Sequence, residues 1–175
     1  MLPASRTIAL RASSRTIRAA VEKADAVVQA RRGVQFPDGR GLLDKLNGLN
    51  AWCKVTVLRL KSCSLGEGGG RALAETLRLN STLKSLNLSE NDLGEGGGRA
   101  LAETLRLNST LTSLDLGGNG LGEGAGRAMA EALRLNSTLT SLDLCFNGLG
   151  EGGGWALVRD TAPQQHAHVA RPQQK

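Results

Sequence analysis

The sequence repeats itself at a fixed interval, and the copies are nearly identical. They align on four equally spaced apolar residues, Val55, Leu83, Leu111 and Leu139, and the unit reads L-x-x-L-x-L-x-x-N-x-L-G-E-G-x-G-R-A-L-A-E-x-L-R-L-N-S-T. A fixed period of this length predicts a solenoid, in which each unit contacts only its neighbours. We expect the array to span 55–161, with units at 55–82, 83–110, 111–138 and 139–161.

The hydrophobic period changes halfway through each unit. In the first unit Leu58 and Leu60 alternate with polar residues, as in a strand, whereas Leu73 and Leu77 lie four residues apart, as on a helix. The sequence therefore predicts an α/β fold of about four parallel strands with helices outside them. The glycines before each helix are poor helix formers, so we expect the helices to begin after them. The expected core positions of the first unit are Val55, Leu58, Leu60, Leu65, Leu73, Leu77 and Leu79.

This pattern resembles the leucine-rich repeats of the ribonuclease-inhibitor type, over residues 55–157. Arrays of this type also occur in NLR-like receptors and in Ran GTPase-activating proteins, and the phrase L-N-S-T-L-T-S-L-D-L is most similar to the NLR-like arrays. The resemblance implies strands on a concave face, helices on a convex face, and a non-catalytic protein-interaction module. Two alternatives are a regulator of a small GTPase and a fragment of a larger NLR-like receptor or scaffold. No Walker A motif is present.

The resemblance also implies a ladder of turn residues after the strands. These are Asn91, Asn119 and Asn147, with Cys63 at the same position of the first unit. A chain that curls over its own core leaves interior N–H and C=O groups without ladder partners. A buried Asn amide bonds both kinds of group, which is the physical reason for Asn at this position.

The ends of the chain are more basic than the repeats. The net charge is +6 over 1–54, −2 over 55–154 and +2 over 155–175. Residues 1–33 are a basic, partly helical arm, because apolar residues recur at helical spacing from about Arg15 to Ala30. The arm is either a mitochondrial or plastid transit peptide or a segment without a targeting signal in a cytoplasmic protein. Contact of the arm with nucleic acid or membrane is a further alternative.

The segments on either side of the array differ from the repeats. Residues 34–54 are interpreted as a degenerate half-repeat that forms a helical N-terminal cap, and 162–175 as a disordered Pro/Gln-rich tail. The final helix, expected over about 152–161, has no evident cap. We therefore expect either self-association through this end or continuation into a longer array.

Residue types that carry chemistry are scarce. The only two histidines, His166 and His168, lie in the tail without a third ligand, so we expect no metal, no cofactor, no catalytic residues and no small-molecule substrate. The three cysteines are an odd number and are interpreted as free thiols. Asn80 and its equivalents, which begin N-S-T sequons, are interpreted as left-handed residues that end the helices.

The outward strand positions define the candidate binding surface for a protein partner. They change from basic at the first strand to acidic at the last, which favours a partner of opposite polarity. The candidate residues are Arg59, Lys61, Ser85, Asn87, Ser113, Asp115, Ser141 and Asp143.

Overall fold

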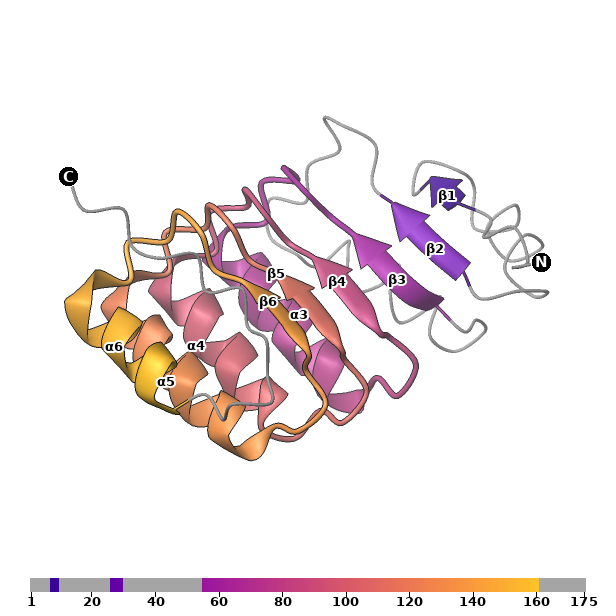
Figure 1. Ribbon diagram of the computed structural model, residues 1–175. Coiled ribbons are helices and arrows are strands. Elements are labelled where there is room, and N and C mark those ends of the chain that lie inside the picture. The colour runs from indigo at the N-terminus through magenta and orange to yellow at the C-terminus, as the bar shows by residue number, and fades with distance from the viewer. Residues whose placement is uncertain (1–6, 10–25, 30–54, 161–175) are drawn as a thin grey trace.

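The computed structural model describes residues 7–9, 26–29 and 55–160. Their strands form a single parallel sheet in chain order (Figure 1). The strands are β1 (Thr7–Ala9), β2 (Ala26–Gln29), β3 (Val55–Arg59), β4 (Ser85–Asn87), β5 (Ser113–Asp115) and β6 (Ser141–Asp143). The helices are α3 (Gly66–Leu79), α4 (Gly94–Leu105), α5 (Gly122–Leu135) and α6 (Gly150–Asp160), and they stack on one side of the sheet.

The predicted leucine-rich-repeat solenoid is confirmed from β3 to α6. Each unit supplies one strand and one helix, and neighbouring strands pair at a shift of one repeat, so that Leu58, Leu86, Leu114 and Leu142 form one row. All four are at most 3% exposed. Neighbouring strands are about 4.8 Å apart and packed helices about 8–10 Å apart, so the helical layer is the longer one. The stack therefore curves with its sheet on the concave side.

The sheet extends further towards the N-terminus than predicted. The prediction of a helix from about Arg15 to Ala30 is wrong at Ala26–Gln29. These residues form strand β2, which pairs with β3. Two adjacent β-branched residues, Val27 and Val28, suit a strand, and pairing with β3 gives the backbone hydrogen-bond partners that local periodicity does not reveal. Apart from β1, which pairs with β2, the rest of the arm lies outside the described residues, as do the cap at 34–54 and the tail at 162–175.

The helices begin at the glycines rather than after them. Gly98 shows why glycine persists inside α4 despite its low helix propensity. A methyl group on Gly98 would lie 2.8 Å from Cβ of Ala125 and 2.9 Å from Cδ2 of Leu121. Similarly, a methyl group on Gly70 would lie 3.1 Å from Cα of Gly97. The glycines thus allow neighbouring helices to approach closely, and this packing offsets their intrinsic cost.

One predicted core position is wrong. Six of the seven expected positions of the first unit are buried, but Leu79 is 83% exposed, and its equivalents Leu107 and Leu135 are 71% and 60% exposed. The reason is geometric. Leu73 and Leu77 lie four residues apart on the buried face of α3, whereas Leu79 follows Leu77 by two residues and so points to the opposite side.

Candidate functional site

Buried asparagines join each unit to the next at the turn that follows the strand. Oδ1 of Asn119 accepts hydrogen bonds from the N–H groups of Asn91 (3.0 Å) and Leu93 (3.4 Å). Its Nδ2 donates to the carbonyl oxygens of Leu88 (3.0 Å) and Leu116 (2.8 Å). Asn91 and Asn147 repeat the pattern, and Cys63 N–H donates to Asn91 at 2.8 Å. These asparagines therefore form a buried hydrogen-bonded ladder in which their donor and acceptor groups are both satisfied.

A second asparagine ladder lies at the opposite edge, where the helices end. Asn108 Nδ2 donates to the Leu77 carbonyl of the preceding unit at 2.9 Å, and its Oδ1 accepts from the N–H groups of Thr110 and Leu111. The left-handed conformation predicted for these residues is wrong: Asn80 has φ −84° and ψ 124°. Asn80 ends the helix through its side chain, whose Oδ1 accepts hydrogen bonds from the N–H groups of Thr82 and Leu83. The N-x-T phrase was the sequence signal for such a turn.

The strand register brings the predicted binding residues together in two columns. Val57, Ser85, Ser113 and Ser141 form one column, and Arg59, Asn87, Asp115 and Asp143 form the other. Both columns lie on the sheet face opposite the leucine row, since successive strand residues point to opposite faces. Arg59 and Ser141 are exposed, and the remaining polar members are half-buried.

Several members of the second column also hold the adjacent turn. Asp115 accepts from Asn87 Nδ2 at 2.7 Å and from Gly117 N–H at 3.0 Å. Asp143 accepts from Cys145 N–H at 2.9 Å, and Asn87 accepts from Ser89, which is only 7% exposed. These bonds fix the carboxylates in place, so the acidic end of the face is rigid before any partner arrives.

The basic end of the face is partly neutralised. Lys61 forms an ion pair of 3.0 Å with Glu90 of the next unit, and both side chains are 57% exposed. An ion pair this exposed contributes at most about 1 kcal/mol and opens readily to a partner. Arg59, by contrast, lies outside the ion pairs of the described residues and is the main cation of this end.

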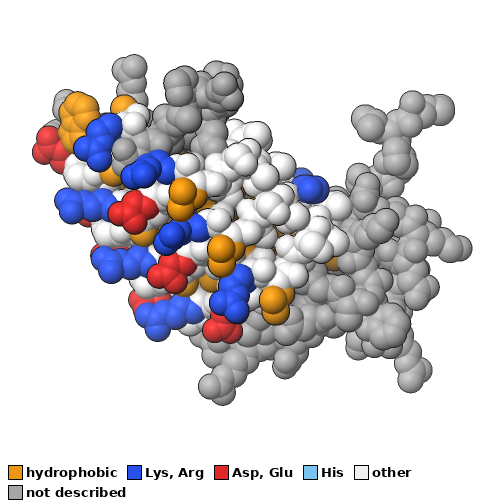
Figure 2. Space-filling model, turned by 90° about the horizontal axis from the view of Figure 1, so that it is seen from below, with side chains coloured by type: hydrophobic (Ala, Val, Ile, Leu, Met, Phe, Trp, Pro, Cys, Tyr) orange, Lys and Arg blue, Asp and Glu red, His pale blue; other side chains and the backbone are white. Residues whose placement is uncertain are grey.

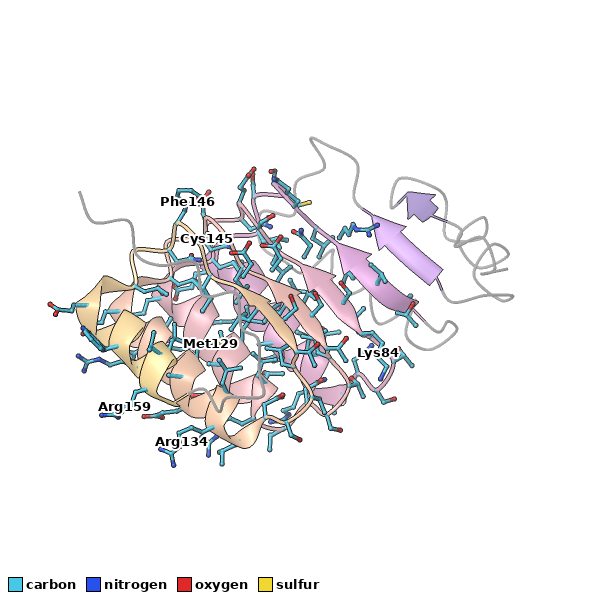
Figure 3. All side chains as sticks on the ribbon, in the orientation of Figure 1. Lys84, Met129, Arg134, Cys145, Phe146 and Arg159 are labelled. Carbon is cyan, nitrogen blue, oxygen red and sulfur yellow. The ribbon has the colours of Figure 1, made fainter. Side chains whose placement is uncertain are left out.

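Phe146 is a candidate contact that the sequence patterns did not reveal. It follows β6 at the rim of the sheet, beside Cys145 (Figure 3). It is 86% exposed and has φ +56°, whereas the equivalent position of the preceding unit is Gly118 with φ +69°. A bulky residue with positive φ is strained. Ser62 (φ +53°) and Glu90 (φ +59°) share this conformation, so it belongs to the turn of every unit, and the exposed ring alone makes Phe146 a candidate contact at the acidic end of the concave face.

The two described cysteines are free, as predicted, and both are poor nucleophiles near neutral pH. The pKa of the Cys145 thiol is raised, mainly by its hydrogen bond to the Asp143 carboxylate and then by burial. Burial alone raises the pKa of Cys63. Both thiols therefore stay protonated. Cys53 lies outside the described residues.

The convex face carries the predicted charge ladder. Ion pairs join Glu67 to Arg71, Glu95 to Arg99 and Glu123 to Arg127, all on the outer side of the helices. Shallow hollows lie between these helices; one is lined by the charged residues of α4 and α5, and another reaches the exposed Trp155 of α6. Both hollows are open to solvent, and paired charges dominate the first.

Two kinds of site are not found in the described part of the chain. Residues 55–160 and the two short N-terminal strands contain no group of three His, Cys, Asp or Glu side chains placed to hold a metal ion. None of the described helices has both the length and the apolar character required to cross a bilayer. His166 and His168 lie outside the described residues.

Comparison with known proteins agrees with the geometry. The family described as Leucine Rich repeat matches at residues 79–102, 107–130 and 135–158, and these three segments follow one another at the interval of the repeat. Among solved structures the chain is similar to Leiomodin-1 Actin-Binding Site 2, with a TM-score of 0.62 and 22% identity over 84% of this chain and 86% of that one. None of the curated proteins matches this chain in sequence.

Proposed function

Because the chain is a leucine-rich repeat protein, we propose that it is a non-catalytic protein-interaction module whose partner binds the concave face of the sheet. The observation that supports this proposal most directly is the pair of outward columns across four strands in register. The second of these columns runs from Arg59 to Asp143. The pairing of one strand with one full helix in every unit also supports the ribonuclease-inhibitor type.

The concave face suits a protein partner rather than a small molecule. Its first column consists of a valine and three serines, so no large side chain protrudes there and an extended partner surface can approach. Its second column places a cation at one end and two carboxylates at the other. Complementary charges of this kind increase the association rate and fix the orientation of a partner.

Reversing the polarity of this face tests the proposal. We expect the double variant Arg59→Glu, Asp143→Lys to lose the proteins that the wild type captures from a native extract, because both ends of the charge gradient then repel the partner. Mass spectrometry identifies the lost proteins, and titration with each purified protein measures the loss. Actin is the first defined partner to test, by co-sedimentation, since the similar solved structure is named as an actin-binding site.

A matched control keeps the net charge and changes the convex face. The variant Glu95→Lys, Arg99→Glu exchanges the members of an exposed ion pair on α4, and it should capture the same proteins as the wild type. Thermal melts establish that both double variants are folded. Capture that survives reversal of the concave face but fails in the convex control would place the binding surface on the helices.

A second prediction concerns Phe146. Replacing Phe146 with Gly removes the exposed ring and relieves backbone strain of about 1–2 kcal/mol, offset by about 0.5–1 kcal/mol of extra chain entropy. We expect the free energy of unfolding to stay unchanged or rise slightly while partner affinity falls. Urea unfolding and partner titration measure the two quantities. Unchanged affinity would show that the exposed ring takes no part in binding.

A further inference from the structure

A row of exposed leucines crosses the lower edge of the array, where the helices end. Leu79, Leu107 and Leu135 occupy the same position of three consecutive units and are 83%, 71% and 60% exposed. Single exposed leucines are ordinary, but three in register on neighbouring units form a continuous apolar stripe. Figure 2 shows apolar side chains in a row beside rows of basic and acidic side chains on this side of the molecule.

The same edge is basic. Arg78, Arg106 and Arg134 each precede one of the leucines and are exposed, and Lys84 lies on the same edge. The segments 78–84, 106–112 and 134–140 contain these four cations and no Asp or Glu. In Figure 3 both Lys84 and Arg134 lie along the lower edge, with Arg134 directed away from the sheet.

Among the described residues, the arginines of this edge take part in none of the ion pairs. Within residues 55–160 the helix ion pairs use Arg71, Arg99 and Arg127, and none of them uses the arginines beside the leucines. A cation at the end of a helix stabilises the helix dipole, which accounts for an arginine there. It does not account for an exposed leucine next to it in three consecutive units, so the combination requires another explanation.

The spacing of the stripe selects the conformation of its ligand. The leucines lie at the C-terminal ends of neighbouring helices, and packed helices are about 8–10 Å apart. A ligand helix advances about 10.5 Å in seven residues, and residue i+7 returns to the same face within about 20°. A ligand strand covers about 10 Å in three residues, but the third residue then points to the opposite face. Of these two conformations, the helix is the one that matches both distance and direction.

We propose that this leucine–arginine edge is a second docking surface, which binds an acidic amphipathic helix with an apolar residue at every seventh position. The helix lies across the C-terminal ends of α3, α4 and α5. Its apolar residues cover Leu79, Leu107 and Leu135, and its carboxylates pair with the adjacent arginines. This surface is separate from the concave face, so the two bind independently.

The acidic residues nearby favour a peptide over an anionic membrane. Glu75, Glu103 and Glu131 are exposed one helical turn before the three arginines. A flat anionic bilayer would meet these carboxylates as well as the arginines. A narrow ligand helix contacts the edge alone and avoids them.

The test uses a synthetic helical peptide of about three heptads, with Leu every seventh residue, Glu on both sides of the leucine stripe and Ala elsewhere. Fluorescence anisotropy with the full chain should show saturable binding below about 1 mM. The triple variant Leu79→Ala, Leu107→Ala, Leu135→Ala should bind about tenfold or more weakly, and so should Arg78→Glu, Arg106→Glu, Arg134→Glu. These side chains are exposed, so both variants should remain folded in thermal melts.

Controls separate this surface from the alternatives. A peptide with Lys in place of Glu should not bind, and the concave-face variant Arg59→Glu, Asp143→Lys should bind as the wild type does. Absence of saturable binding, or equal binding by the leucine variant, would overturn the proposal. So would sedimentation of the wild type with phosphatidylglycerol vesicles without binding to the peptide, since the edge would then be a membrane contact.

Discussion

Replacing Asn119 with Ala is expected to lower the free energy of unfolding by about 3 kcal/mol, because the substitution leaves buried backbone N–H and C=O groups of two units without hydrogen-bond partners. The Asn119 side chain is 1% exposed and bonds backbone groups of its own unit and of the preceding unit. An alanine methyl group satisfies none of these groups, and water has no access to the site. Urea unfolding followed by circular dichroism measures the change.

Asn87 supplies a matched control for this prediction. It is also an asparagine with several hydrogen bonds, but it is half-buried and lies on the concave face, where water can replace its partners. We expect Asn87→Ala to cost no more than about 1 kcal/mol. An equal effect of the two substitutions would show that the buried ladder has no special role in joining the units.

Replacing Leu114 with Ala is expected to lower the free energy of unfolding by about 3–5 kcal/mol. Leu114 lies in the middle of the buried row, between Leu86 and Leu142, and is 1% exposed. Its removal leaves a cavity that the paired strands on both sides cannot collapse to fill. Denaturant unfolding again measures the loss.

Leu107→Ala is the control for Leu114→Ala, since it makes the same chemical change at a residue that is 71% exposed. The expected change in unfolding free energy is within about 0.5 kcal/mol. A large loss of stability in Leu107→Ala would show that the exposed leucine row serves the fold, and would remove the main reason for assigning it to a partner.

The repeat made the array predictable from the sequence, whereas features set by contacts between units were predicted less well. The period determined the register, because residues one period apart must occupy equivalent places in a stack, and hence it placed Leu86 beside Leu114. Helix starts were wrong because the propensity of glycine is a local property. The close approach of Gly98 to Ala125 on the next helix is instead a property of the packed structure, and it explains why glycine is kept there. Strand β2 was missed because its pairing with β3 depends on tertiary structure.

The candidate site shows the same division. Alternation within each strand was enough to place Arg59, Asn87, Asp115 and Asp143 in one column. The exposure of Leu79 was obtainable from its angular position on the helix, but hydrophobicity alone suggested burial. The candidate role of Phe146 rests on the exposure of its ring, which an aromatic residue in a sequence does not reveal.

Contacts between leucine methyl groups in solution test the central claim, that the units stack in one row with this register. Neighbouring strands are about 4.8 Å apart, and alternate strands about twice that. In nuclear Overhauser spectra we expect cross-peaks joining Leu86 to Leu114 and Leu114 to Leu142, and none joining Leu86 to Leu142 directly. Absence of the first two cross-peaks in the folded protein would contradict the stacked arrangement on which both docking surfaces depend.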